Sequence, residues 1–247
     1  MRWVVTLARS ISTWVSGVVA TIILGPIAVV IAIINDTSPW IEKLIQAWSS
    51  VWLRTSGCRL EIEGQENIDP ERSYVVVANH LSTLDIMACF RATGIPIRYL
   101  AKKELFRLPI LAQAMRAVGI IEVDRAARGA IHASVNRQAK ELIEKRRSLI
   151  IYAEGTRPRN GIMKPFKKGA FTMAVASGLP ILPMSIHGSF EAMPPGTPWV
   201  RGGPVRIVID PAIETEGMTH GEVGELRDQV RAIIAERVSA MGGRVSS

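Results

Sequence analysis

Cysteine and charge are both scarce in this sequence of 247 residues. Cys58 and Cys89 are too few for a disulfide framework or for a zinc site of four thiolates, so we expect a reducing compartment, the cytoplasm. Only 21% of the residues are charged and 48% are hydrophobic, which excludes a disordered chain and indicates contact with a membrane. Repeats and low-complexity linkers are missing, so the length fits one domain with a small addition.

Histidine is rare as well. His132, His187 and His220 are scattered along the chain, with neither a carboxylate nor a second histidine at the spacing of metal ligands. We therefore expect no metal ion. No cysteine or serine is clearly set up as a nucleophile, and Ser82 occupies a position typical of a helix cap.

Positive charge is in excess, with a formal net charge of +8 at neutral pH. This favours an anionic partner, which could be a phosphate-bearing substrate, an acidic carrier protein, an anionic lipid surface or a nucleic acid. Charge alone does not choose among them. Five of the six tryptophans lie in the first 52 residues rather than among basic residues on a strand, so we expect no nucleic-acid partner.

The amino-terminal region combines an uncharged run with these aromatic residues. Residues 10–34 carry no charge, and as one straight helix they would reach roughly 37 Å, more than a hydrocarbon core. Because Gly25-Pro26 interrupts the run and proline removes a backbone hydrogen bond, two shorter helices are predicted here. Apolar residues recur at helical spacing over 41–52, which predicts a further helix along a surface. Since tryptophan favours the headgroup level of a bilayer, this region is predicted to bind membranes.

The orientation of this region follows from its positive charge. Arg2 and Arg9 would hold the amino end of a single span in the cytoplasm and send the remaining chain outside. A helix pair that enters one leaflet and returns keeps both ends on the cytoplasmic side, so we favour this monotopic arrangement over a plain transmembrane anchor or a signal peptide. We assign residues 1–56 to membrane-anchoring helices and residues 57–247 to the second domain.

The second domain alternates short apolar runs with helical patterns, which is typical of an α/β fold. Strands are predicted at residues 59–63, 74–78, 97–101, 119–123, 149–153, 181–186 and 205–209. Helices are predicted at residues 84–93, 109–118, 128–146, 169–177 and 221–240. Thr219 and Glu222 have the spacing of a capping box ahead of the last helix, to which we give a packing role only.

The most informative stretch is Asn-His-Leu-Ser-Thr-Leu-Asp at 79–85, directly after the apolar strand 74–78. On one helix, side chains five residues apart would point about 140° away from each other. His80 and Asp85 can therefore meet only if the helix begins between them, as Ser82-x-x-Asp85 indicates. An imidazole oriented by a carboxylate is a general base for an alcohol. The alternative is that Asp85 merely caps the helix while His80 bonds locally.

Three further blocks accompany this motif: Gly-Ile-Ile-Glu-Val-Asp-Arg at 119–125, Glu-Gly-Thr-Arg at 154–157 and Leu-Pro-Ile-Leu-Pro at 179–183. Taken in order, the four blocks resemble the glycerolipid acyltransferase family, most closely the 1-acylglycerol-3-phosphate acyltransferases. Lys-Lys-Glu-Leu at 102–105 is similar to a further stretch of that family. The resemblance covers residues 61–213. It implies a mixed sheet flanked by helices, behind the membrane-associated helix pair.

The resemblance also implies roles for single residues. His80 and Asp85 would form the catalytic dyad. The phosphate and glycerol of the acceptor would be held by Lys102, Arg125, Glu154, Gly155, Thr156 and Arg157. Guanidinium groups bind phosphate with a rigid fork, whereas Glu154 would repel it, so we expect Glu154 to accept from a substrate hydroxyl or to orient Arg157. The alternative for Arg125 and Arg157 is ordinary surface pairing with Asp124 and Glu154.

The expected reaction moves an acyl group from a thioester, on acyl carrier protein or coenzyme A, to the sn-2 hydroxyl of lysophosphatidic acid, giving phosphatidic acid. No further cofactor is expected. The enzyme would work at the cytoplasmic face of the inner or plasma membrane, with membrane phospholipid as a partner. Glycerol 3-phosphate or another lysolipid is an alternative acceptor. A lipid-binding or scaffold protein without catalysis is the alternative of another class.

Overall fold

A mixed seven-stranded sheet forms the centre of the computed structural model, which describes residues 2–123, 141 and 144–246. Its strands are β1 (Cys58–Glu63), β2 (Val75–Ala78), β3 (Ile97–Lys102), β4 (Ile121–Val123), β5 (Ser148–Tyr152), β7 (Ile181–His187) and β8 (Gly203–Ile209). They lie in the order β1-β8-β7-β2-β5-β3-β4, and every pair is parallel except β7 with β8. The mixed α/β sheet and its seven predicted strands are confirmed.

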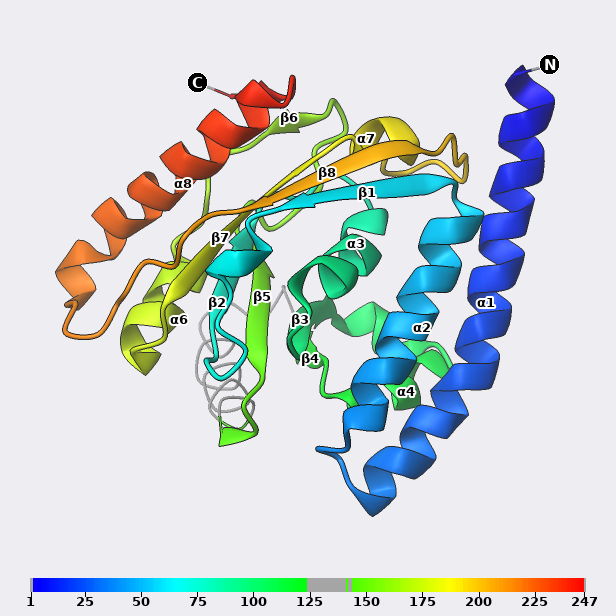
Figure 1. Ribbon diagram of the computed structural model, residues 1–247, viewed down its shortest axis with the longest axis horizontal. Coiled ribbons are helices and arrows are strands. Elements are labelled where there is room, and N and C mark those ends of the chain that lie inside the picture. The colour runs from blue at the N-terminus through cyan, green and yellow to red at the C-terminus, as the bar shows by residue number, and fades with distance from the viewer. Residues whose placement is uncertain (1, 124–140, 142–143, 247) are drawn as a thin grey trace.

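Helices cover both faces of this sheet (Figure 1). The longer ones in the α/β part are α3 (Leu84–Thr93), α4 (Leu111–Val118), α6 (Gly169–Ser177) and α8 (Val223–Ala240), close to four of the predicted ranges. Shorter turns are η1 (Gln65–Asn67), η2 (Lys103–Arg107), α7 (Ser189–Ala192) and η3 (His220–Glu222). A small second sheet joins β6 (Ile162–Met163) to β9 (Arg244–Val245). The predicted helix at 128–146 lies mostly outside the described residues.

Strand β2 is fully buried because both of its faces are covered. Val75 and Val77 pack with residues of α6 and α8, whereas Val76 and Ala78 pack with residues of α3 and the amino-terminal helices. This alternation is the two-residue period of a strand.

The predicted capping box of Thr219 and Glu222 is present at the start of η3, directly before α8.

The amino-terminal region is a helical hairpin, but it turns at a different place from the predicted one. Helix α1 (Arg2–Ile34) runs without interruption through Pro26, so the prediction of two shorter helices broken at Gly25-Pro26 is wrong. The chain reverses after Asn35, and α2 (Pro39–Thr55) begins with Pro39 in its first turn and the Ser38 side chain as its cap. A proline in a helix interior costs about 3 kcal/mol, a local loss that packing along a long helix offsets.

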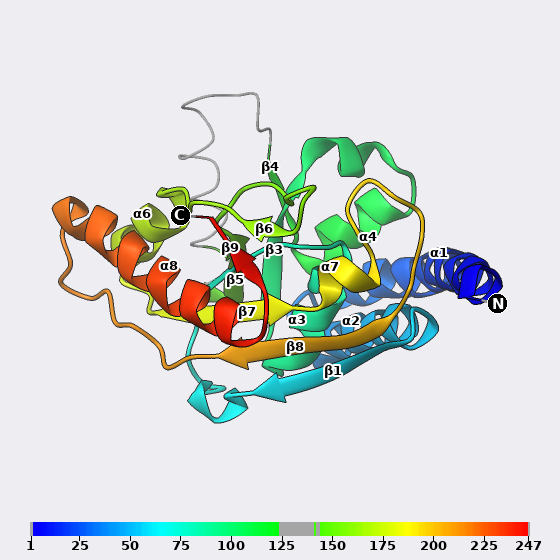
Figure 2. The same cartoon turned by 90° about the horizontal axis from the view of Figure 1, so that it is seen from above.

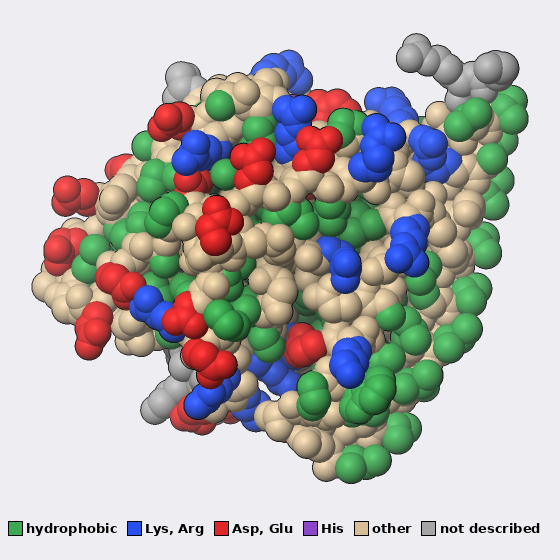
Figure 3. Space-filling view, in the orientation of Figure 1, with side chains coloured by type: hydrophobic (Ala, Val, Ile, Leu, Met, Phe, Trp, Pro, Cys, Tyr) green, Lys and Arg blue, Asp and Glu red, His purple; other side chains and the backbone are tan. Residues whose placement is uncertain are grey.

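Gly25 allows α4 to pack closely on α1 and does not interrupt the helix. A methyl group placed on it would lie 3.3 Å from side-chain carbons of Ile110 and Ala114, so α4 approaches the backbone of α1 here. Helices α1 and α2 pack side by side at one end of the molecule, with α8 at the other (Figure 1). The outer face of α1 stays exposed, and hydrophobic side chains form a band along it (Figure 3). By length and composition α1 could cross a membrane, which fits the predicted membrane association.

Candidate active site

His80 and Asp85 meet at the carboxyl end of β2, as the motif predicted. His80 Nδ1 lies 2.8 Å from Asp85 Oδ2, with His80 on the turn after β2 and Asp85 in the first turn of α3. The His80 side chain is 15% exposed and that of Asp85 is fully buried. When Nδ1 donates its proton to the carboxylate, the nitrogen of a neutral ring that can accept a proton is Nε2.

The same carboxylate oxygen fixes the turn. Asp85 Oδ2 accepts from the backbone N–H groups of Leu81, at 2.6 Å, and Ser82, at 2.7 Å. Ser82 Oγ accepts from the Leu84 N–H at 3.2 Å and donates to the Met193 carbonyl at 2.7 Å. Asp85 therefore bonds both His80 and the turn that precedes α3, whereas the first N–H group of the helix, that of Leu84, is bonded by Ser82 and not by Asp85.

Asn79, also in this motif, joins neighbouring strands. Its amide donates to the Ile186 carbonyl and accepts from the Ile186 N–H, both at 2.8 Å, which ties the end of β2 to β7. This side chain is fully buried. The position of His80 is thus fixed by bonds to α3 on one side and by a tie to β7 just before it.

Tyr152, the last residue of β5, stacks on the His80 ring with 3.7 Å between ring centroids and 7° between planes. Its other neighbours are Tyr99, stacked at 5.7 Å, and Cys89, whose sulfur lies 3.8 Å from the phenol oxygen. Burial raises the pKa of the Tyr152 phenol well above its ordinary value, so this hydroxyl stays protonated. No local pattern in the sequence points to Tyr152, because its approach to His80 depends on β2 lying beside β5, where Ala78 pairs with Tyr152.

Glu154 contacts the backbone rather than a guanidinium. Its Oε1 accepts from the His80 N–H and its Oε2 from the Lys164 N–H, both at 2.8 Å. The side chain is buried, and this burial raises its pKa to about 7 in spite of the two hydrogen bonds. The expectation that Glu154 orients Arg157 is therefore wrong. Glu154 is instead a support that joins the His80 turn to the segment after the Glu-Gly-Thr-Arg block.

The rest of that block forms an exposed basic loop. Arg157 Nη1 donates to Thr83 Oγ1, so the guanidinium lies beside the start of α3, and it does not pair with Glu154. Lys164 Nζ is 3.5 Å from Thr156 Oγ1. Gly155 has a φ of +75°, a backbone conformation that favours glycine, and its Cα faces the end of the Lys167 side chain.

One of the two remaining predicted binding residues lies farther along the sheet edge. Lys102 ends β3, and its ammonium pairs with Glu104 at 3.2 Å, so the contacts of the described residues do not join it to the dyad. Arg125 lies outside the described residues. The fourth block begins β7 and therefore lies at the opposite edge, where the Pro180 carbonyl accepts from the Val75 N–H at 3.0 Å.

Chemically, the site offers a general base with a fixed tautomer beside a cationic loop. Neither thiol suits a nucleophile, because burial raises the pKa of Cys58 and raises that of Cys89 to about 12. Among the described residues, no three His, Cys, Asp or Glu side chains gather as metal ligands would. The arrangement suits removal of a proton from a hydroxyl in an anionic substrate.

The family model and the relatives found by comparison with known proteins are all acyltransferases. The family model described as Acyltransferase matches residues 59–187. The 1-acyl-sn-glycerol-3-phosphate acyltransferase of Pseudomonas aeruginosa is 30% identical, over 82% of this chain and 80% of that protein. The mouse 1-acyl-sn-glycerol-3-phosphate acyltransferase alpha is 33% identical over 71% of this chain. The chain spans 62% of the length of the mouse protein.

The fold is also that of a solved structure. The crystal structure of the 1-acyl-sn-glycerophosphate (LPA) acyltransferase PlsC from Thermotoga maritima superposes with a TM-score of 0.83 at 26% identity, over all of both chains. The likeness includes the amino-terminal hairpin as well as the sheet, because neither chain has an unmatched part.

Proposed function

Because this chain belongs to the acyltransferase family, we propose that it transfers an acyl group from a thioester to the sn-2 hydroxyl of 1-acylglycerol 3-phosphate. The observation that carries the proposal is the 2.8 Å contact between His80 Nδ1 and Asp85 Oδ2 at the carboxyl end of β2. The names of the relatives support this acceptor, and the cationic loop beside His80 suits its phosphate.

The proposed reaction is a direct transfer. His80 Nε2 takes the proton of the acceptor hydroxyl while that oxygen attacks the thioester carbonyl carbon. The carbon–oxygen bond forms and the carbon–sulfur bond then breaks. The imidazolium returns its proton to the departing sulfur, so the products are an ester and a free thiol. Asp85 holds the ring in the required tautomer and stabilises its charged form during the reaction.

The phosphate of the acceptor is proposed to lie against the Glu-Gly-Thr-Arg loop. Arg157 and Thr156 are exposed there, and Lys164 and Lys167 lie close to the same turn. A guanidinium binds phosphate through a planar fork of two donors, whereas the lysines contribute point charges. Both carboxylate oxygens of Glu154 accept backbone hydrogen bonds, from His80 and from Lys164, and burial raises its pKa to about 7, which lowers the negative charge that it would present to phosphate.

We also propose that the chain binds one leaflet without crossing it. The α/β domain touches α1 near both of its ends. The Trp3 ring lies 6.4 Å from that of Trp199, Trp14 Nε1 donates to the Pro198 carbonyl at 2.9 Å, and Ile31 packs against the main core. If α1 crossed the bilayer, the polar α/β domain attached to it would be drawn into the hydrocarbon core.

Cysteine labelling in sealed vesicles tests this arrangement. Single cysteines placed at Ala8 and at Glu66 should both react with a membrane-impermeant reagent added on the cytoplasmic side, and neither should react from the opposite side.

A turnover assay with purified protein tests the function. Lysophosphatidic acid, glycerol 3-phosphate and a lysolipid with a larger headgroup are compared as acceptors, each with acyl-carrier-protein and coenzyme A thioesters. Lysophosphatidic acid should give the highest kcat/KM, and His80→Ala should lower it by about 10²- to 10⁴-fold. The exposed His220→Ala variant is the matched control and should keep full turnover. Equal turnover of the His80→Ala variant and the wild type would refute the dyad, and binding of lipid without turnover would favour the scaffold alternative.

A further inference from the structure

The exposed large hydrophobic side chains of the described residues are confined to one region. Fourteen of them lie on α1 and one, Trp40, begins α2. The α/β domain contributes only four: Leu105 at 41% exposed, Leu108 at 49%, Ile110 at 37% and Trp199 at 38%. Single exposed apolar residues scattered over a surface need no explanation. Two of these four lie against α1, Ile110 at Gly25 and Trp199 at Trp3, and the other two belong to the short segment that leads to Ile110.

Residues Leu105–Ile110, here named the apolar loop, are held outward by the fold. Phe106 is buried, and the guanidinium carbon of Arg116 lies 5.2 Å from its ring centroid, which anchors the loop in the domain. Ile110 adopts a φ of +66°, a conformation that a β-branched residue rarely takes. This backbone turns the chain from the apolar loop into α4, whose Ala114 packs on α1. The exposed side chains are therefore fixed beside α1 rather than left on a loose tip.

The charge around the apolar loop points to the chemistry of what covers it. Lys102, Lys103 and Arg107 are basic and Glu104 is acidic, so this stretch carries +3 − 1 = +2. Apolar side chains beside lysine and arginine are typical of surfaces that enter the headgroup region of an anionic bilayer. A protein partner or a second copy of this chain would have to cover α1 and the apolar loop together.

We propose that the apolar loop is a membrane-contact element of the α/β domain itself, which enters the headgroup and acyl boundary of an anionic leaflet next to α1. This rests on the proposed one-leaflet binding. A single helix lying in a bilayer leaves its attached domain free to roll about the helix axis. Contact through the apolar loop, to one side of that axis, removes this freedom and holds the edge of the sheet that carries His80 in one orientation to the lipid.

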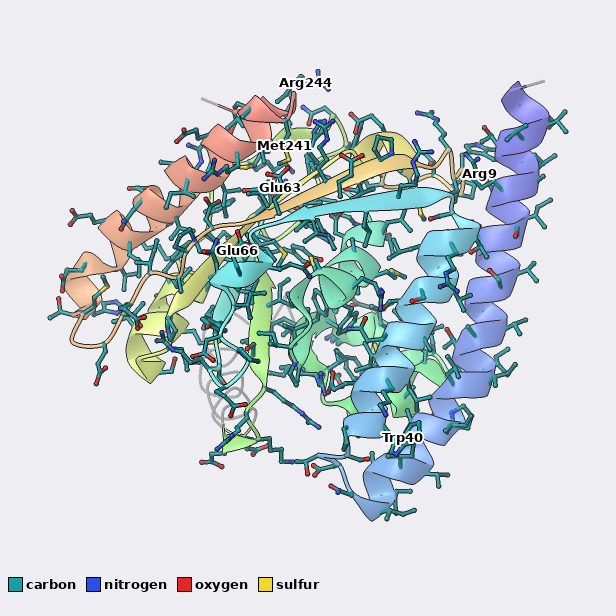
Figure 4. The ribbon with its side chains drawn as sticks, viewed as in Figure 1. Arg9, Trp40, Glu63, Glu66, Met241 and Arg244 are labelled. Atoms are coloured by element: carbon teal, nitrogen blue, oxygen red, sulfur yellow. The ribbon has the colours of Figure 1, made fainter. Side chains whose placement is uncertain are left out.

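The placement can be tested without any activity measurement. An environment-sensitive fluorophore is attached at Leu108→Cys, and a matched probe is attached at Glu66→Cys, which lies beyond the end of β1 (Figure 4). In Figure 2, β1 and α4 lie on opposite sides of the molecule. The raised pKa values of Cys58 and Cys89 keep both native thiols slow to label. Vesicles contain either phosphatidylcholine alone or a mixture with an anionic lipid, each with or without nitroxide-labelled lipid.

The probe at residue 108 should shift to the blue and be quenched by nitroxide lipid, more strongly in anionic vesicles, while the probe at residue 66 stays in water. Equal emission of both probes on vesicles that bind the protein would overturn the proposal. A probe at residue 108 that is shielded before lipid is added, in a protein that sediments as a dimer, would also overturn it and assign the surface to a second copy. Neither result depends on whether the chain is an acyltransferase.

An activity measurement tests the consequence of the contact. Leu105→Ser with Leu108→Ser should lower turnover of acceptor embedded in anionic vesicles on the order of tenfold, because less apolar surface enters the bilayer. Turnover of a short-chain acceptor in free solution should be unchanged, because neither residue belongs to the site. Loss with both acceptors to the same degree would show that the loop supports the fold instead. Wild-type turnover with both would show that the contact does not orient the domain.

Discussion

The imidazole of His80 is held at its edge by Asp85 and at its face by Tyr152, and only the first of these contacts is polar. A stacked aromatic ring limits rotation of the imidazole about the bond that joins it to Cβ. We therefore expect Tyr152 to act as a positioning residue, since its ring contacts His80 while its hydroxyl lies 3.8 Å from the buried Cys89 sulfur.

Replacing the stacked ring should reduce the rate of the chemical step. We expect Tyr152→Leu to lower kcat by about 10- to 100-fold with little change in KM, because a small misplacement of a catalytic group has that effect. Tyr152→Phe keeps the ring and should keep most of kcat. Steady-state kinetics of both variants measure this. Similar losses in the two variants would assign the effect to the hydroxyl and contradict a stacking role.

Glu154 should make stability depend on pH. Its pKa is raised from 4.5 to about 7, first by burial, so between these values the folded chain holds a proton that the unfolded chain has lost. The contribution to the free energy of unfolding is therefore fully present below about pH 4.5 and is lost as pH rises to about 7, by about 3 kcal/mol. Denaturant titrations at several pH values measure this slope.

Glu154→Gln removes the titrating group and should flatten that part of the pH profile. Below about pH 4.5 the variant is also expected to be less stable by about 1–2 kcal/mol, because an amide cannot accept both backbone hydrogen bonds. This difference should shrink and reverse as pH rises to about 7, because only the wild type then loses the contribution of Glu154. The free energy of unfolding of the variant is subtracted from that of the wild type at each pH, so that the contributions of other titrating groups cancel. Parallel profiles for the wild type and the variant would show that Glu154 keeps an ordinary pKa.

Helices α1 and α2 pack tightly at Gly17, where an added methyl group would overlap the indole ring of Trp52. Gly17→Ala should lower the free energy of unfolding by about 1–3 kcal/mol, the usual cost of overpacking. Gly169→Ala is the matched control, because nothing lies within 4 Å of a methyl group at this helical position. Thermal denaturation compares the two, and equal shifts in Tm would contradict the close contact.

The helices and strands were well predicted where local pattern decides them. Strand 74–78 is a short apolar run before a turn, and helix 84–93 follows a cap signal, so both were found close to their observed bounds. The predicted break at Pro26 was wrong because the free-energy cost of one proline in the helix is smaller than the gain from packing the inner face of α1 against its neighbours. The neighbours of each strand could not be predicted, since no local signal brings β1 beside β8.

The same limit applies to the site. The meeting of His80 and Asp85 could be predicted because five residues and one helix start determine it. The partners of Glu154 could not, because they are backbone N–H groups at positions 80 and 164 that only the assembled sheet brings together. Tyr152 was missed for the same reason.

At the scale of the whole molecule, the helical hairpin and the sheet share one core. Ile41, Ile45, Trp52 and Leu53 of α2 belong to the same buried cluster as β2, β5 and β7. Arg98 on β3 is fully buried, and its guanidinium bonds with the carboxylate of Glu42 on α2. The division at residue 56 therefore stays a prediction about sequence regions, and we expect residues 57–247 produced alone to be insoluble.

Glu42→Gln tests this connection with the full chain. It leaves a buried guanidinium without its charged partner, and we expect a loss of about 3 kcal/mol in the free energy of unfolding. Glu214→Gln breaks the exposed pair with Arg72 and should cost under about 1 kcal/mol. Urea denaturation in detergent measures both. A similar small loss in the two variants would indicate that the hairpin and the sheet are joined by apolar contacts alone.

The parallel pairing of β1 with β8 also sets the order in which the chain can fold. Every other strand of the main sheet lies between these two in the sequence, so β1 has no partner until nearly all of the sheet has been synthesised. Closing so long a loop is slow, and pairing of strands that are distant in sequence lowers the folding rate. Helix α1, made before β1, meanwhile has an apolar surface that water does not stabilise. Under the proposed one-leaflet binding, the bilayer takes up α1 while the chain is still being made, and it acts as a folding partner of the nascent chain before the finished sheet can act at its surface.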